Sequence, residues 1–347
     1  MMIFKTRKRF WLFALGGVVA YLAGVVLINA NLVPASEQQS PPPMASLPSQ
    51  VSLTFTVATW NLGYAGLGAG SNFIADGGSA LLPPSRRAVD ENLQGILATL
   101  PDIDSDIMLF QEVSNASPLS YWAPVRQELL NAFADRQSFY RPDAASRFIP
   151  FPLAIDHGTV SVSRINPAGI EIVPLPSEPG AMLGFLKRRY ALHVMRFPVA
   201  DRASQLVIAN LHLSAFDDGG HTRQAQIDAV LAFAQAEFAE GNYVVLGGDW
   251  NMVLSDPGIA HQTDDKYLFW IHPFPEEKLP EGWALVTDRS TPTVRTLHQP
   301  YVAGDNYVTS IDGFIISPNL TTQAVHTKDL QFQFSDHQPV KATFTMR

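Results

Sequence analysis

Cysteine is absent from the 347 residues of the chain. Its absence excludes disulfide bonds, zinc sites with thiolate ligands, thiol catalysis and a lipid-modified N-terminal cysteine. The Gly-x-Ser-x-Gly, Walker and His-Glu-x-x-His patterns are also missing, so serine hydrolases, P-loop NTPases and zincins have no support. A metal site in this chain would therefore use oxygen and imidazole ligands.

Charge is scarce as well. Charged residues make up 16% of the chain, against roughly 25% in an average globular domain. The 46% of apolar residues is normal and excludes a disordered, collagen-like or coiled-coil chain. Four cations and no acid lie in the first thirty residues, which leaves 20 basic and 32 acidic residues and a formal charge of −12 after them. This acidic part lacks the broad basic surface that sequence-independent duplex binding normally needs.

Residues 10–28 form a run of nineteen uncharged residues after the basic stretch that ends at Arg9. Because about 20 apolar residues span a bilayer, the length favours an uncleaved inner-membrane anchor with its basic flank in the cytoplasm. The rest of the chain would then lie outside the cytoplasm, in the periplasm if the source is a bacterium. The alternative is a long signal peptide cut near Val33, which would release a secreted protein. A buried core helix is disfavoured because no polar face interrupts the run.

The sequence divides into three parts. Residues 1–30 form the membrane anchor or signal segment, and residues 31–50 are rich in proline and serine and predict a disordered tether. Residues 51–347 form one folded domain, since no second low-complexity break or internal repeat interrupts them.

Within this domain, strands outnumber helices. A Ser85 cap and the apolar spacing after it predict a helix to about Leu100. Helices are also expected over 122–134 and 222–238. Alternating or buried apolar runs predict strands over 53–59, 107–110, 159–163, 190–197, 206–213, 243–246, 284–287, 307–316, 321–326 and 340–345. Helices set among this many strands favour an α/β layered sandwich over a doubly wound parallel sheet.

Polar residues follow the apolar strands at six places. A single case would be ordinary turn chemistry, but six in a chain with so little charge indicate a site at one rim of the sandwich. Such a rim suits a hard divalent cation beside a bound phosphate. The six stretches are Trp60-Asn61, Gln111-Glu112, Asn210-Leu211-His212, Gly248-Asp249-Trp250-Asn251, Ile311-Asp312-Gly313 and Ser335-Asp336-His337.

In this order, the six stretches resemble the endonuclease/exonuclease/phosphatase superfamily, whose members include DNase I, abasic-site endonucleases, neutral sphingomyelinases and inositol polyphosphate 5-phosphatases. Each motif alone is weak, and the ordered set is specific. The resemblance covers about residues 53–344. It implies a four-layer α/β/β/α sandwich of the DNase I type, with two mixed sheets flanked by helices.

The resemblance also implies a metal site. Glu112 is expected to bind Mg2+, with Asn61 beside it and Asp336 helping to hold the ion; Mn2+ is an alternative ion. Mg2+ accepts few protein oxygens and keeps several waters, which suits so small a ligand set. Arg295 is a candidate ligand for the substrate phosphate, although a solvated or structural role is the simpler interpretation of an isolated arginine.

The catalytic residues implied by the resemblance are His212, Asp249, Asn251, Asp312 and His337. Asp312 would orient the His337 imidazole, and His212 would donate to a phosphate oxygen as charge builds there. Asp249 would orient or deprotonate the attacking water, and Asn251 would bind the phosphoryl oxygen. Either Asp249 or His337 can serve as the base.

The other seven histidines match no motif and are interpreted as surface or structural residues. They are His157, His193, His221, His261, His272, His298 and His326.

The predicted reaction is Mg2+-dependent phosphoester hydrolysis by in-line attack of water, outside the cytoplasm. The first substrate hypothesis is nucleic acid, cleaved by a phosphodiesterase of the endonuclease type, and the charge of −12 argues against it. The alternative is a lipid headgroup phosphoester, cleaved by a sphingomyelinase-like or inositol-phosphatase-like enzyme. For that alternative, aromatics of residues 267–274 would touch a bilayer; the simpler interpretation packs them on the sandwich. A non-catalytic binding module is disfavoured because every catalytic position holds a competent residue. No feature identifies a protein partner.

Overall fold

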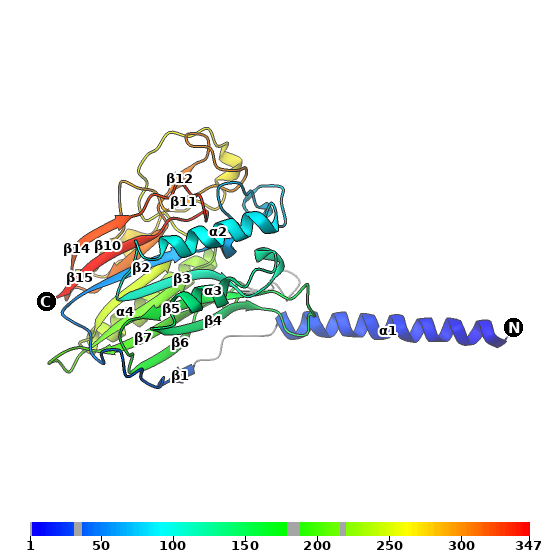
Figure 1. The fold of residues 1–347 in the computed structure, drawn as a ribbon, viewed down its shortest axis with the longest axis horizontal. Coiled ribbons are helices and arrows are strands. Elements are labelled where there is room, and N and C mark those ends of the chain that lie inside the picture. The colour runs from blue at the N-terminus through cyan, green and yellow to red at the C-terminus, as the bar shows by residue number, and fades with distance from the viewer. Residues whose placement is uncertain (1, 31–36, 179–187, 216–219) are drawn as a thin grey trace.

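The computed structural model describes residues 2–30, 37–178, 188–215 and 220–347, and Figure 1 shows its fold. Within the described residues the strands form two large mixed sheets and a two-stranded ladder. Helix α2 (Arg86–Thr99) and helix α3 (Val125–Ala132) cover one sheet, and helix α4 (His221–Ala239) covers the other. The four-layer sandwich expected from the sequence is confirmed.

The first sheet has six strands and contains the first catalytic motifs. Strands β2 and β3 run parallel at its centre, and their neighbours are antiparallel. The order is β14 (Leu320–Thr327), β15 (Val340–Met346), β2 (Thr54–Asn61), β3 (Ile107–Ser114), β5 (Asp156–Ser163) and β4 (Gln137–Ala145).

The second sheet has seven strands and the same plan, with β8 and β9 as its parallel pair. The order is β1 (Glu37–Gln39), β6 (Gly169–Pro174), β7 (Ala191–Pro198), β8 (Gln205–His212), β9 (Tyr243–Asp249), β13 (Asp312–Ile316) and β10 (Ala284–Val286). The ladder joins β11 (Val294–Arg295) to β12 (Val308–Thr309). Short 3-10 helices are η1 (Gly63–Ala65), η2 (Ile74–Asp76), η3 (Pro118–Ser120), η4 (Asp265–Tyr267) and η5 (Glu276–Lys278).

The core lies between the sheets, where alternate strand residues from both inner faces meet. Phe55 and Phe344 from the six-stranded sheet pack with Val245 and Phe314 from the seven-stranded sheet. Helix α2 begins as predicted, because the Ser85 side chain accepts a hydrogen bond from the backbone NH of Ala88.

Buried amides join the two sheets near the predicted site. The Gln111 side chain, on β3, donates to Asn210 Oδ1, on β8, at 2.8 Å. The Asn210 amide in turn donates to the backbone carbonyls of Phe110 and Val160 at 3.3 and 3.1 Å. Leaving a buried amide unpaired costs free energy. These hydrogen bonds therefore favour one alignment of the two packed sheets over others.

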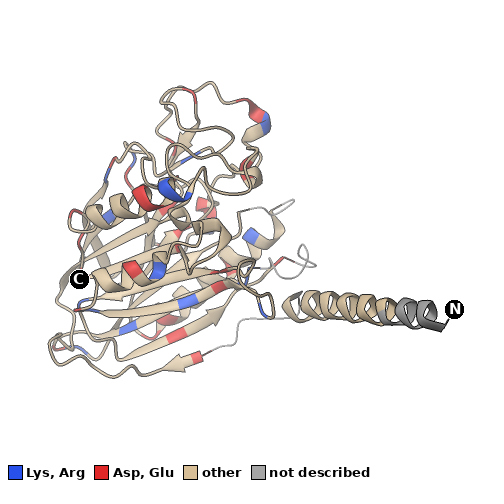
Figure 2. Ribbon diagram, turned by 45° about the vertical axis from the view of Figure 1, so that its right-hand side comes forward, with Lys and Arg blue, Asp and Glu red and all other residues tan. Residues whose placement is uncertain are grey.

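Helix α1 (Met2–Ala30) extends away from the sandwich (Figure 1). Its residues Trp11–Asn29 are long and apolar enough to cross a membrane, a property that anchors and signal sequences share. Figure 2 shows no charged residue along α1 from Trp11 onward, whereas Lys, Arg, Asp and Glu are scattered over the sandwich.

The expected tether is ordered over the part that the structure describes. Strand β1 pairs with β6, and Asn166 bonds the backbone of Met44 and Leu47. The prediction of disorder over 37–50 is therefore wrong: the segment has little to bury, but its backbone groups find partners at the edge of the seven-stranded sheet. Residues 31–36, including the proposed cleavage point at Val33, lie outside the described residues.

Candidate active site

The two parallel strand pairs carry their polar ends to one rim. Asn61 ends β2, Glu112 lies near the end of β3, His212 ends β8 and Asp249 ends β9. Glu112 has φ of 52° at a bulge in β3, a strained backbone that turns its side chain into the rim. Asp312 begins β13 directly opposite Asp249. Residues distant in the sequence therefore meet at one place.

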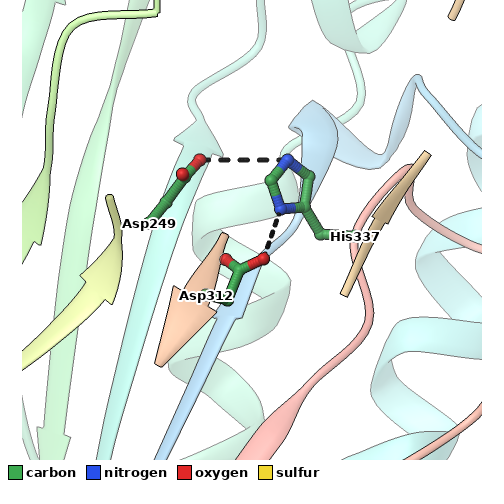
Figure 3. Close-up of side chains that lie close together, drawn as sticks. All are labelled: Asp249, Asp312 and His337. Carbon is green, nitrogen blue, oxygen red and sulfur yellow. Dashed lines mark hydrogen bonds and ion pairs between the residues drawn. The ribbon is translucent and has the colours of Figure 1, made fainter. Parts of the chain in front are cut away.

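Asp249, Asp312 and His337 converge most closely (Figure 3). His337 Nδ1 lies 2.8 Å from Asp312 Oδ2, and its Nε2 lies 3.8 Å from Asp249 Oδ2. The indole NH of Trp60 donates to the His337 backbone carbonyl at 3.0 Å and helps fix the loop. Burial opposes protonation of His337, but Asp312, Asp249 and Asp336 outweigh it and hold its pKa well above the usual range.

Asp249 is held by amides on both sides. Asn61 donates to Asp249 Oδ2 and the backbone NH of Asn251 donates to Oδ1, both at 2.9 Å. Burial, with a contribution from the charge of Asp312, raises the pKa of Asp249 to about 7. The Asn251 side chain donates to the Leu213 carbonyl at 2.8 Å. Asn61, Asp249 and Asn251 are thus brought together as the sequence predicts.

His212 joins this cluster to residues that the motifs did not reveal. Its Nε2 lies 3.5 Å from Asp249 Oδ2, and its Nδ1 lies 3.8 Å from Asp143 Oδ2, on β4. Burial and the neighbouring Arg188 lower the pKa of His212 to about 3, so the ring is neutral. Asp143 also lies 3.0 Å from His157 Nδ1. His157 is therefore a buried neighbour of the site, which is compatible with its structural interpretation and excludes a surface position.

Arg188 is a further residue that the motifs did not reveal. It lies just before β7 and reaches Glu112 Oε1 at 2.7 Å, the Tyr64 hydroxyl at 2.6 Å and His212 Nε2 at 2.9 Å. Burial alone would raise the pKa of Glu112, but the charge and hydrogen bond of Arg188, with the hydrogen bond from Tyr64, more than offset it and lower the pKa. A single arginine in the run Lys187-Arg188-Arg189 gives no motif, so only the fold reveals this contact.

The sequence model of the Endonuclease/Exonuclease/phosphatase family matches residues 58–337, well over half of the chain. The chain belongs to this family. Members are metal-dependent phosphoesterases, so the chain is a hydrolase of phosphoester bonds.

Solved structures share the fold at low sequence identity. An endonuclease/exonuclease/phosphatase from Beutenbergia cavernae is 21% identical, with a TM-score of 0.56 over 84% of this chain and 72% of that one. A family protein from Bacteroides vulgatus is 13% identical, with a TM-score of 0.52 over 85% and 99%. D. rerio TDP2, complexed with a single-strand DNA product, is 16% identical, with a TM-score of 0.50 over 84% and 99%. No curated protein matches the sequence.

The rim of this phosphoesterase fits a divalent cation. Side-chain ligand atoms of Asp249, Asp312 and His337 lie within 4.8 Å of one another. Burial, reinforced by the Glu112 carboxylate, raises the pKa of Asp336 to about 6, and the pKa of Asp249 is raised too. Raised pKa values indicate negative charge that the protein leaves uncompensated, which a divalent ion would offset.

A small cavity of about 40 Å³ lies beside these groups, and its lining includes Asp76, Asp336 and His337. It has room for an ion or a few waters. Of the expected metal ligands, Asp336 faces this cavity, Asn61 is bonded to Asp249, and Glu112 is bonded to Arg188. Asp76, on η2, is a carboxylate that no motif indicated.

Arg295 also lines the cavity, but its guanidinium is engaged elsewhere. The side chain is buried and donates to the carbonyls of Leu67, Gly68 and Ser71 at 3.1, 2.8 and 3.3 Å. Burial lowers the pKa of Arg295 to about 10. With these contacts, Arg295 stabilises the loop over residues 67–71. The expected contact of Arg295 with the substrate phosphate stays a prediction.

Proposed function

We propose that the chain is a Mg2+-dependent phosphodiesterase that acts outside the cytoplasm, with Asp249, His337, Asp312, His212 and Asn251 as its catalytic residues. The observation that carries the proposal is the buried Asp312–His337 pair, with Asp249 3.8 Å from its outer nitrogen. A neutral histidine, His212, lies 3.5 Å from the same carboxylate; its Nε2 accepts a hydrogen bond from Arg188, so this nitrogen can donate to a phosphate only after that bond is given up. Together they offer Asp249 as a group that can receive a proton, and His337 and His212 as groups that can bind phosphoryl oxygens.

The pKa directions support one division of the roles that the sequence left open. With its pKa held high, His337 is protonated near neutral pH and donates to a phosphoryl oxygen. Asp249, whose pKa is about 7, is the group that can accept a proton from the attacking water. We therefore infer that Asp249 is the base and His337 the phosphate donor. His212 and the Asn251 side-chain amide bind the other negatively charged phosphoryl oxygens.

Glu112, Asn61 and Asp336 are the proposed ligands of Mg2+, and Asp249 and Asp312 add nearby negative charge. The ion would neutralise phosphate charge and orient the substrate. The residues themselves hold the water, the phosphate and the proton. Because Glu112 pairs with Arg188, binding of the ion at this carboxylate requires the guanidinium to give up or share its bond.

Nucleic acid is the first proposed substrate class, supported by the fold shared with TDP2, which was solved with a single-strand DNA product. A single strand needs a smaller basic surface than a duplex, which suits a domain with so few cations. The second class is lipid headgroup phosphoesters, supported by the candidate membrane span in α1, which extends from the end of the sandwich opposite the C-terminus (Figure 1). The aromatic segment 267–274 adds little to it, because Trp270 and Phe274 are buried and Tyr267 stacks on His298.

A substrate panel tests the proposal. Full-length protein with Mg2+ is assayed on single-stranded DNA, RNA, phospholipid vesicles and inositol phosphates. The Asp249→Asn variant should lose about 10²- to 10⁴-fold in kcat, the range for removal of a general base. Asp265→Asn, at an exposed position on η4, is the matched control and should keep wild-type activity. Equal rates for Asp249→Asn and wild type would exclude Asp249 as the base, and lipid turnover without nucleic acid cleavage would reverse the order of the substrates.

A further inference from the structure

The loop between β4 and β5, residues 146–155, is an apolar segment with exposed side chains. It contains Ser146, Arg147 and eight apolar residues, with no acid. Phe148, Phe151 and Leu153 are 65%, 74% and 66% exposed. Exposed apolar side chains that cluster in this way mark an interaction surface, whereas isolated ones are ordinary.

Trp122 extends the same patch from outside the loop. Its indole NH donates to the Pro152 carbonyl at 2.9 Å, and its ring centre lies 6.5 Å from that of Phe151. The patch thus combines a tryptophan, two phenylalanines, a leucine and one cation, Arg147. Aromatic residues with flanking cations are typical of the interface between lipid and water.

Helix α1 docks against this loop. The Asn29 side chain pairs with the Arg147 backbone in both directions, donating to its carbonyl at 2.9 Å and accepting from its NH at 2.7 Å. The Tyr21 hydroxyl donates to the Phe148 carbonyl. Val25 and Asn29, one turn apart, are buried within the part of α1 whose side chains are described, Trp11–Asn29. The loop therefore lies beside the last two turns of the candidate membrane span.

The geometry of α1 gives the depth at which the 146–155 loop would lie in a bilayer. Trp11–Asn29 has 19 residues, so it extends about 28 Å, close to the roughly 30 Å of a bilayer's hydrocarbon core. Tyr21 lies eight residues before Asn29, about 12 Å along the helix axis, and the Phe148 carbonyl lies between these two levels, since Arg147 bonds Asn29 and Phe148 bonds Tyr21. If α1 crosses a membrane, Phe148 is carried into the outer leaflet, and Phe151 and Leu153 on the same short loop lie at its surface.

We propose that the 146–155 loop and Trp122 form a membrane-contact surface that inserts into the outer leaflet of the bilayer crossed by α1. The surface rests on the anchor and is independent of which phosphoester is cleaved. Arg147 is exposed at its edge, where its cation can meet lipid phosphates. The contact restrains the domain at a second point, so the sandwich cannot swing freely about the end of the helix.

This contact also orients the active site. Asp143, which lies 3.8 Å from His212, is three residues before the loop, and Arg189 bonds the Ala145 carbonyl at 2.6 Å. Strand β15 ends near the C-terminus, at the opposite end of the domain from α1, and β2 is antiparallel to it, so Asn61 lies at the end that faces α1 (Figure 1). The site rim thus lies toward the membrane surface.

Single-cysteine labelling tests the proposal cleanly because the chain has no cysteine of its own. Full-length Phe151→Cys, Leu22→Cys and Val302→Cys proteins are labelled with an environment-sensitive fluorophore in nanodiscs, which leave both membrane faces accessible. Leu22 reports on the anchor, and Val302, 50% exposed and outside the patch, is the control. Each label is challenged with nitroxide lipids and with aqueous iodide.

The Phe151 label should be quenched by shallow nitroxide lipids and be several-fold less accessible to iodide than the Val302 label. Iodide quenching equal to that at Val302, with Leu22 quenched by lipid, would overturn the membrane contact and leave the anchor intact. A Leu22 label that lipid nitroxides do not quench would remove the anchor and the inference with it. Protection of Phe151 that depends on protein concentration and not on lipid nitroxides would assign the patch to a second copy of the chain. Catalysis is not measured, so these outcomes do not depend on the proposed reaction.

Discussion

Arg188 is expected to compete with the metal ion for Glu112. The guanidinium bonds Glu112 Oε1 at 2.7 Å, and the two side chains are 19% and 11% exposed. A hydrogen bond between charged groups of this kind contributes about 1.5 to 3 kcal/mol. An ion that binds Glu112 must offset that contribution. Replacing Arg188 by methionine keeps most of the side-chain volume and removes the competing charge.

The Arg188→Met protein should therefore bind Mn2+ or Mg2+ about 10- to 100-fold more tightly, since about 1.4 kcal/mol corresponds to a tenfold change in affinity. Titration calorimetry, or paramagnetic resonance of free Mn2+, measures this affinity without any substrate. Arg189→Met is the matched control, because the neighbouring guanidinium bonds the Ala145 carbonyl and not Glu112. Its metal affinity should match that of wild type.

Unchanged or weaker metal binding by Arg188→Met would refute the competition. That result would mean that the ion and Arg188 use separate oxygens of Glu112, or that the ion lies nearer to Asp312 and Asp336. A rate measurement alone cannot replace the titration, because Arg188 also lies 2.9 Å from His212 and its loss can lower kcat by that route.

Three further outcomes follow from the contacts. Asp312→Asn should lower kcat by about 10³- to 10⁴-fold with unchanged circular dichroism, because His337 loses the carboxylate that orients and charges it; a kcat equal to that of wild type would contradict the pairing. Arg295→Met should lower the free energy of unfolding in urea by about 3 kcal/mol, since several buried carbonyls lose their donor; a raised KM with unchanged stability would instead support phosphate binding. Burial, with Arg141 adding a like charge, lowers the pKa of His193 from 6.5 to about 3, so the unfolded chain binds more protons than the native one between these values. The contribution of His193 to the free energy of unfolding is therefore most favourable above pH 6.5, and it falls by about 3 kcal/mol by pH 4. His193→Gln should not show this loss in urea titrations at the two pH values, and equal losses in both proteins would exclude His193 as the cause.

Strands with regular apolar alternation, such as β2, β8 and β15, were predicted within two residues of their observed bounds. Strand β4 was missed because Arg141-Pro142-Asp143 interrupts its pattern, and the register shifts between Pro142 and Ala144. Of these residues, Asp143 lies beside His212 and His157 at the site. The polar residue that interrupts the strand pattern is therefore explained by tertiary structure. The expected single strand over 307–316 is divided into β12 and β13.

The candidate site also contains residues that the local sequence predicts and residues that only the fold reveals. Motif residues such as Asp249 and His337 were recognisable because their motifs lie next to predicted strands and occur in a fixed order along the chain. Arg188, Asp143 and Tyr64 carry no such signal: each is a common residue type, and its place at the site depends on contacts between segments distant in the sequence. The local sequence pattern therefore predicts the residues at strand ends. The neighbours that shift the pKa values of those residues can be identified only from the folded structure.

The amide bridge between Gln111 and Asn210 has a consequence for inactivation by heat or denaturant. One half of the site, with Asn61 and Glu112, belongs to the six-stranded sheet, and the other half, with His212, Asp249 and Asp312, belongs to the seven-stranded sheet. If the layers part, each sheet can keep its backbone ladders while the catalytic atoms drift out of reach. A compact state with native-like secondary structure but loosened layers would thus be inactive. Enzyme activity in this chain reports whether the sandwich is closed, and it should vanish before far-ultraviolet circular dichroism changes.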